Sequence, residues 1–141
     1  MSMVVDTCVI IDIYCGDPIF ADKSAQVLDL KRNNGLIVAP ISYVELAPSF
    51  KGDYEAQDEF LHNLGINVQF EGKRDVVIAA YNAWYEHITR KRMGKDVRRP
   101  IADVMIGAYA LEKGGLITRN KEDFRSLYPT LKILNPTTTT I

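Results

Sequence analysis

The sequence has few of the features that mark membrane, secreted or disulfide-bonded proteins. No apolar run approaches the ~20 residues that a membrane-spanning helix needs, and no basic segment precedes an apolar stretch at the start of the chain. We therefore expect neither a membrane span nor a signal peptide. The only cysteines, Cys8 and Cys15, have a spacing that matches no common zinc site or disulfide framework. Two reduced thiols in a cytoplasmic protein are the expectation.

Histidine is scarce, and charge of neither sign is in excess. The two histidines, His62 and His87, lie in helical segments away from the acidic residues described below, which disfavours a metal-free mechanism built on a histidine pair. The net charge is −1, yet six of the 17 basic residues fall between residues 90 and 99. This window is either a solvated helix end or a phosphate-binding rim. Its proximity to Asp103 favours the rim.

What the sequence does contain is a regular alternation of apolar runs and helical patterns. With 141 residues, 47% of them apolar and 25% charged, the chain fits one globular domain. Short apolar runs predict strands at 4–7, 36–39, 66–70, 116–118 and 131–134. Amphipathic segments predict helices at 19–33, from 42, and at 53–64, 74–92, 100–113 and 122–128. We expect a three-layer α/β/α domain over residues 1–136, with a mainly parallel sheet of four to five strands, and a flexible tail at 137–141.

Polar and acidic side chains follow or interrupt four of these apolar segments. They are Asp6, Glu45, Asp103, and Asn120 together with Asp123. A carboxylate beside a buried segment is costly unless a metal or a cation compensates it. Because the carboxyl ends of parallel strands share one edge of a sheet, these residues are expected to form a site for a hard metal ion. That site would suit metal-dependent phosphodiester chemistry.

Each of these residues also has a purely structural explanation. Asp6 could be the N-cap of a following helix, and Ser42 with Glu45 has the spacing of a capping box. Asp103 could pair with an arginine of the preceding basic window. Asn120 and Asp123 could form a turn and an N-cap. Taken together, these explanations require four independent coincidences at the same end of one sheet.

Four short motifs follow one another along the chain. They are Asp6-Thr7 after an apolar strand, Ser42-x-x-Glu45, Pro100-x-x-Asp103-x-x-Ile106, and Thr118-Arg119-Asn120 with Asp123-Phe124. In this order and spacing they resemble the PIN-domain family, and more closely the VapC toxins of bacterial and archaeal toxin–antitoxin pairs. The resemblance covers residues 3–136. It implies a Mg²⁺- or Mn²⁺-dependent endoribonuclease, held inactive by a small VapB-like antitoxin and commonly forming a homodimer.

The resemblance also implies roles for individual residues. The catalytic set is Asp6, Glu45, Asp103, Asn120 and Asp123, and the metal ligands are Asp6, Glu45 and Asp103. Supporting hydroxyl groups come from Thr7, Ser42 and Thr118. Arginines suited to RNA phosphate are Arg98, Arg99 and Arg119. Asn120 stands where many family members carry aspartate, so the choice between one and two metals stays open, with Asp123 as a source of the missing charge.

Other functions and a partner surface follow from the same residues. A PIN-like module that binds RNA or protein without cutting is the main alternative, because Asn120 brings no charge to the site. A phosphatase with an aspartyl-phosphate intermediate is disfavoured, since position 8 is Cys where that chemistry needs a second aspartate. The segment with Tyr43 and Phe50 resembles a partner surface of the family, and it is the first candidate for the antitoxin dock.

Overall fold

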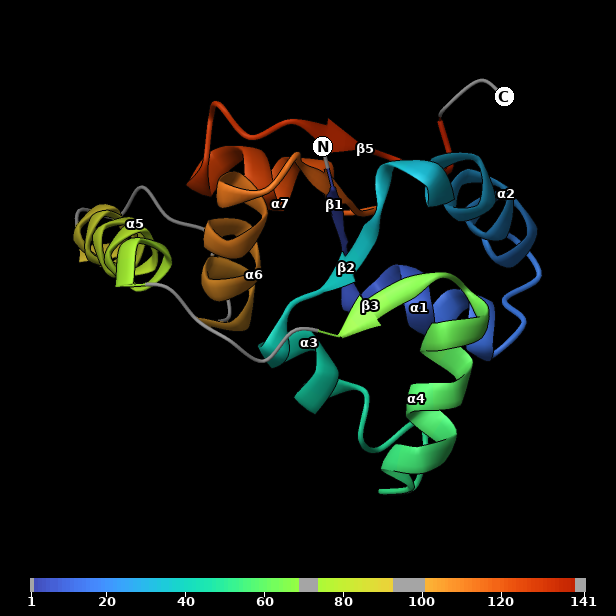
Figure 1. Ribbon diagram of the computed structural model, residues 1–141. Helices are drawn as coiled ribbons and strands as arrows, with labels where there is room; N and C mark the ends of the chain where they lie inside the picture. The colour runs from blue at the N-terminus through green and yellow to red at the C-terminus, as the bar shows by residue number, and fades with distance from the viewer. Residues whose placement is uncertain (1, 69–73, 93–100, 139–141) are drawn as a thin grey trace.

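The protein is described by a computed structural model, which places residues 2–68, 74–92 and 101–138. Its centre is a five-stranded sheet of order β3-β2-β1-β4-β5 in which every pair of neighbours is parallel (Figure 1). The strands are β1 (Met3–Val5), β2 (Leu36–Val38), β3 (Ile66–Val68), β4 (Leu116–Ile117) and β5 (Ile133–Leu134). The predicted parallel sheet is therefore confirmed. The predicted third strand also included residues 69 and 70, which lie outside the described residues.

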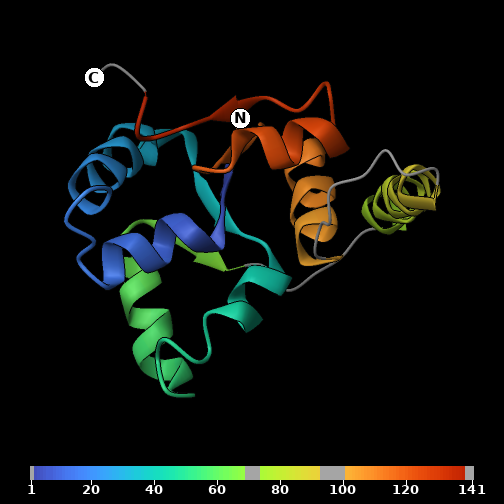
Figure 2. The ribbon, with the colours of Figure 1, turned by 180° about the vertical axis from the view of Figure 1, so that it is seen from behind.

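Helices connect the strands and cover both faces of the sheet. They are α1 (Thr7–Tyr14), α2 (Ala21–Lys31), the 3₁₀ turn η1 (Arg32–Asn34), α3 (Pro40–Glu45), α4 (Tyr54–Asn63), α5 (Arg74–Arg92), α6 (Ile101–Glu112) and α7 (Lys121–Leu127). Figures 1 and 2 show α6 and α7 on one side of the sheet, with α5 packed outside α6, and α1, α2 and α4 on the other. The predicted three-layer α/β/α architecture is confirmed.

The pleat of β1 explains why its apolar run is unbroken. Val4 packs into the core formed with α5, α6 and α7, whereas Met3 and Val5 pack into the core formed with α1, α2 and α4. All three side chains are buried. A strand covered on both faces needs apolar residues at every position, because successive side chains point to opposite faces.

Two local predictions are wrong. The helix α1 starts at Thr7, directly after β1, where the sequence predicted the end of a strand. Helix α3 starts at Pro40 with Ala39 as its N-cap, so Ser42 lies inside the helix and forms no capping box with Glu45. The reason is that the fixed φ of proline suits the first helical turn, which moves the start of the helix two residues earlier.

Tyr128, the C-cap residue of α7, helps to hold that helix against α6. The ring of Tyr128 lies over Gly107, where an added Cβ would be 2.4 Å from the Cε2 atom of the ring. The Tyr128 hydroxyl donates to the carbonyl oxygen of Val104 at 2.6 Å. These contacts fix the first two turns of α6, which include Asp103.

None of the helices in the described part of the chain has the length and apolar character required to cross a bilayer.

Near the C-terminal end, the side chain of Asn135 accepts from the backbone N–H and the hydroxyl of Thr137, at 3.0 and 2.7 Å. Residues 139–141 of the predicted tail lie outside the described residues. The domain boundary at 136 stays a prediction.

Candidate functional site

The candidate site lies at the carboxyl ends of the two central strands, β1 and β4. These strands are parallel neighbours with Val5 in register with Ile117, so the residues that follow them, Asp6 and Thr118, lie side by side. The backbone N–H of Asp6 donates to the carbonyl oxygen of Ile117 at 2.9 Å, which extends the ladder by one residue. This edge is where open α/β sheets bind ligands.

Asp6 is a buried carboxylate whose charge is met by neutral donors. It is 4% exposed. Its Oδ1 accepts from the Thr7 backbone N–H at 2.7 Å, and its Oδ2 accepts from the Thr118 hydroxyl at 2.7 Å and from the Cys8 thiol at 3.5 Å. No lysine, arginine or histidine of the described ranges forms an ion pair with it. Asp6 is also the N-cap of α1, which confirms the structural explanation considered for this residue.

The protonation equilibrium of Asp6 reflects this setting. Burial raises the pKa of Asp6 above its ordinary value, and the negative charge of Glu45 raises it further. Hydrogen bonds from Thr118, Cys8 and Thr7 act in the opposite direction but do not outweigh the burial. A positive charge at this point would favour the ionised form of both carboxylates.

Thr7 links Asp6 to the second acidic residue of the site. Glu45 is the exposed last residue of α3, and its Oε1 accepts from the Thr7 hydroxyl at 2.7 Å. One residue thus binds both carboxylates, through its backbone N–H and through its side chain. On the same helix, one turn before Glu45, Ser42 is fully buried and its Oγ has no hydrogen-bond partner among the described residues.

The turn between β4 and α7 contributes the polar groups next to Asp6. The backbone N–H of Asn120 donates to the Thr118 hydroxyl oxygen at 3.0 Å, and its side-chain amide lies 4.0 Å from the Cys8 sulfur. Asn120 occupies the N-cap position of α7, but its side chain makes no capping hydrogen bond. The structural explanation therefore does not account for this side chain. Asp123 lies half-buried in the first turn of α7.

Asp103 lies half-buried in the first turn of α6, as the sequence predicted. This helix packs against β1, β4, α3 and α7, the elements that carry or adjoin the other site residues. Two of the arginines predicted to bind RNA phosphate, Arg98 and Arg99, lie outside the described residues. The third, Arg119, forms an ion pair with Asp12, a contact that the sequence interpretation missed.

The oxygen donors at this edge are of the type that a hard divalent cation binds, but the described residues do not gather three acidic ligands into one group. Within residues 2–68, 74–92 and 101–138, no three His, Cys, Asp or Glu side chains are arranged to hold a metal ion. The structure does bring Asp6 and Glu45 together through Thr7, with a buried hydroxyl, Ser42, on the same helix as Glu45. Oxygen donors with uncompensated negative charge are what Mg²⁺ and Mn²⁺ select.

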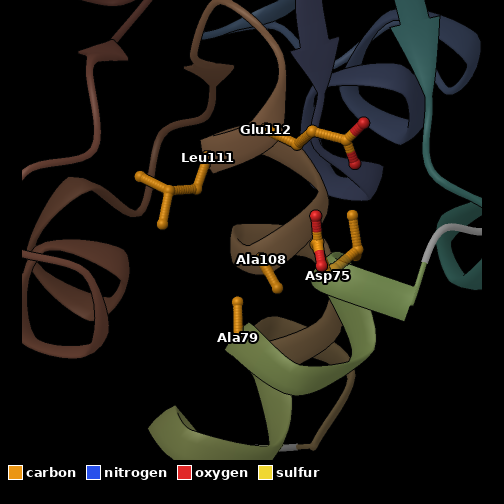
Figure 3. Close-up of a pocket in the computed structure, with 6 residues that line it drawn as sticks. Asp75, Ala79, Ala108, Leu111 and Glu112 are labelled. Atoms are coloured by element: carbon orange, nitrogen blue, oxygen red, sulfur yellow. The ribbon is translucent and has the colours of Figure 1, made fainter.

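Two surface grooves lie away from Asp6. One, of about 270 Å³, lies between α3 and α4 and is lined by Tyr43, Val44, Ala47, Gly52, Tyr54 and Gln57. The other, of about 190 Å³, lies between α5 and the C-terminal half of α6, where Ala79 faces Ala108 and the carboxylates of Asp75 and Glu112 lie at one end (Figure 3). Tyr43 thus lines a groove as expected for a partner surface. Phe50 does not, because it lies beyond α3 and is buried against the rings of Tyr14 and Phe60.

Comparisons with known proteins agree on the fold. The sequence profile of the PIN domain matches residues 3–128. A crystal structure of VapBC2 from Rickettsia felis, bound to a DNA fragment from their promoter, contains a chain that superposes with a TM-score of 0.72 at 17% identity. The superposition covers 96% of this chain and 98% of that one. No curated protein matches the sequence.

Proposed function

This chain belongs to the PIN-domain family, and from that premise we propose that it is a metal-dependent endoribonuclease, the toxin of a toxin–antitoxin pair. PIN domains are generally nucleases. The observation that carries the proposal is Asp6, a carboxylate buried at the sheet edge with no cationic partner in the described chain and with a second carboxylate, Glu45, tied to it through Thr7.

In this proposal Asp6, Glu45 and Asp103 are the residues that would hold Mg²⁺ or Mn²⁺. When bound, the ion lowers the pKa of a coordinated water and neutralises charge on the scissile phosphate. The protein groups do the orienting. Thr118 and the Thr7 backbone fix the Asp6 carboxylate, the Thr7 hydroxyl fixes Glu45, and hydrolysis leaves a 5′-phosphate and a 3′-hydroxyl.

Asn120 and Asp123 complete the proposed site from the β4–α7 turn. The exposed Asn120 amide is free of a capping role, so its oxygen is available to orient a water or a phosphate. Asp123, one helical turn further, supplies the charge that Asn120 lacks. The basic window at 90–99, with Arg98 and Arg99, is the proposed phosphate rim.

The proposed partner is a small antitoxin that occupies the groove between α3 and α4. Val44 and Tyr54 in this groove are 65% and 66% exposed, a high value for side chains of this type. The groove adjoins Glu45 in sequence, so a bound peptide could extend to the site. A homodimer is proposed as well, and size-exclusion chromatography with light scattering at micromolar concentration tests it directly; a monomeric mass contradicts it.

Cleavage of end-labelled structured RNA by Asp103→Asn tests the proposed function. We expect wild-type cuts in Mg²⁺ or Mn²⁺, none in EDTA, and a loss of at least about 100-fold in the variant, since a ligand and its charge are removed. Asp53→Asn is the matched control, because Asp53 is an exposed N-cap of α4 and asparagine caps equally well. Full activity of Asp103→Asn contradicts the assignment.

One alternative function is favoured by a specific observation. The neutral Asn120, together with the absence of a three-ligand group in the described ranges, suits a PIN-like module that binds RNA or protein without cutting. Such a module would retard RNA in a gel without shortening it. Calorimetry with Mn²⁺ separates the two functions, since the nuclease binds the ion and the module does not.

A further inference from the structure

We propose that Asp12 and Arg119 are positioning residues of this site: their ion pair locks the β4–α7 turn so that Thr118 and Asn120 face Asp6. The inference rests on the proposed nuclease function and deepens it. It assigns to Arg119 a role different from the phosphate ligand that its sequence context indicates.

The ion pair joins two segments 107 residues apart. The Nε of Arg119 donates to Oδ2 of Asp12 at 2.5 Å, and its Nη2 donates to Oδ1 at 3.2 Å. The guanidinium also lies over the ring of Phe20, 4.1 Å from its centroid. A two-point fork with a stacked third contact fixes orientation as well as distance. Arg119 is therefore held by α1 and by the segment that precedes α2.

The sequence position of Arg119 connects the ion pair to the site. Its two sequence neighbours are Thr118, whose hydroxyl donates to Asp6, and Asn120, whose N–H donates to that same hydroxyl oxygen. These three residues lie between β4 and α7. The Thr118 N–H donates to the Leu134 carbonyl oxygen of β5 at 3.1 Å, and the Asn120 carbonyl oxygen accepts from the Phe124 N–H of α7 at 3.4 Å. The ion pair adds a side-chain constraint at Arg119, between these two anchored residues.

Burial explains why Arg119 stays with Asp12. The Asp12 side chain is only 8% exposed, and that of Arg119 is 27% exposed. If the guanidinium moved away to bind phosphate, it would leave a buried carboxylate without its counter-charge, which is strongly unfavourable. The hydrogen bonds to Asp12 raise the pKa of Arg119 above its ordinary value. The Nε and Nη2 donors of the fork are thus used within the protein.

Kinetics of Asp12→Asn, Arg119→Lys and Arg119→Gln on RNA distinguish positioning from phosphate binding. For positioning residues we expect kcat to fall about 10- to 100-fold with KM changed less than about 2-fold. Lysine, which keeps the charge but loses the fork, should retain more activity than glutamine. Asp29→Asn is the matched control, because it removes the partner of an exposed ion pair with Arg32. A lower KM in Asp12→Asn, or a raised KM with unchanged kcat in the Arg119 variants, overturns the proposal in favour of a phosphate ligand.

Amide hydrogen exchange gives a readout that does not depend on activity. The backbone N–H of Asn120, bonded to the Thr118 hydroxyl, should exchange at least about 10-fold faster in Asp12→Asn, and its increase should exceed that of the β1 amide of Val4, bonded to Gly115, which reports the loss of global stability. An increase at Asn120 no larger than that at Val4 overturns the proposal. Exchange is measured without RNA, so it tests the role of the ion pair independently of cleavage. If wild-type protein leaves RNA intact, that result contradicts the proposed function but not the role of the ion pair.

Discussion

Replacing Asp6 by asparagine is expected to stabilise the metal-free protein. The side chain is 4% exposed, and the charge is met only by neutral donors from Thr7, Thr118 and Cys8. Burial outweighs these donors, as the raised pKa of Asp6 shows. Asparagine can keep the bond from the Thr7 N–H, and its NH₂ group can donate to the Thr118 oxygen. We expect a net gain of about 1–2 kcal/mol, or roughly 3–8 °C in Tm.

The pH dependence of this gain has a definite sign. Because the pKa of Asp6 is raised in the folded state above its ordinary value of 3.8, the folded protein holds this proton to higher pH than the unfolded chain does. Wild-type stability therefore falls as pH rises from that ordinary value through the folded-state pKa. The variant lacks this contribution. Its advantage over wild type should grow with pH and then level off.

Urea denaturation in EDTA, from pH 4.5 to 8, measures both effects. Asp12→Asn is the matched control, because Asp12 is nearly as buried but has a cationic partner in Arg119. Asp12→Asn breaks the ion pair with Arg119 and should lower the free energy of unfolding by about 1–3 kcal/mol, an effect opposite in sign to that of Asp6→Asn. Added Mn²⁺ should then stabilise wild type and leave Asp6→Asn unchanged. Destabilisation of both variants by similar amounts refutes the view of Asp6 as an uncompensated charge.

Two further substitutions test the packing and the hydrogen bonds around the site. Gly107→Ala places a Cβ 2.4 Å from the Tyr128 ring. We therefore expect the free energy of unfolding to fall by about 1–3 kcal/mol. An unchanged urea midpoint contradicts the described contact. Thr118→Val keeps the side-chain shape but removes the hydroxyl between Asp6 and Asn120. We expect the rate of RNA cleavage to fall about 10- to 100-fold. A wild-type cleavage rate in this variant would show that the hydroxyl does not orient Asp6.

The sheet could be predicted from the sequence because its central strands are buried on both faces. The runs at 3–5, 36–38 and 116–117 are apolar at every position, a pattern that parallel strands require. Helix α1 was not predicted because its sequence shows no clear helical period. Its residues 8–11 are all apolar, so they leave no polar stripe, and the helix has only eight residues.

The site could be predicted in its parts but not in its contacts. The sequence predicts that Asp6 and the Asn120 turn lie at one edge, because parallel strands deliver the residues that follow them to the same end of the sheet. The bridge from Thr7 to Glu45 and the pairing of Asp12 with Arg119 depend on side-chain rotamers across 38 and 107 residues of sequence. Asp12 did carry a signal, a carboxylate inside an apolar helix, of the same kind that singled out Asp103.

The most direct test of the central claim is cleavage of end-labelled structured RNA by wild-type protein and Asp6→Asn, each with Mg²⁺, with Mn²⁺ and with EDTA. We expect cuts by wild type only when a divalent ion is present, and none by the variant, even though the variant is the more stable protein and its inactivity cannot be ascribed to unfolding. Equal cleavage by the two proteins, or wild-type cleavage that persists in EDTA, contradicts a nuclease built on Asp6 and a divalent metal.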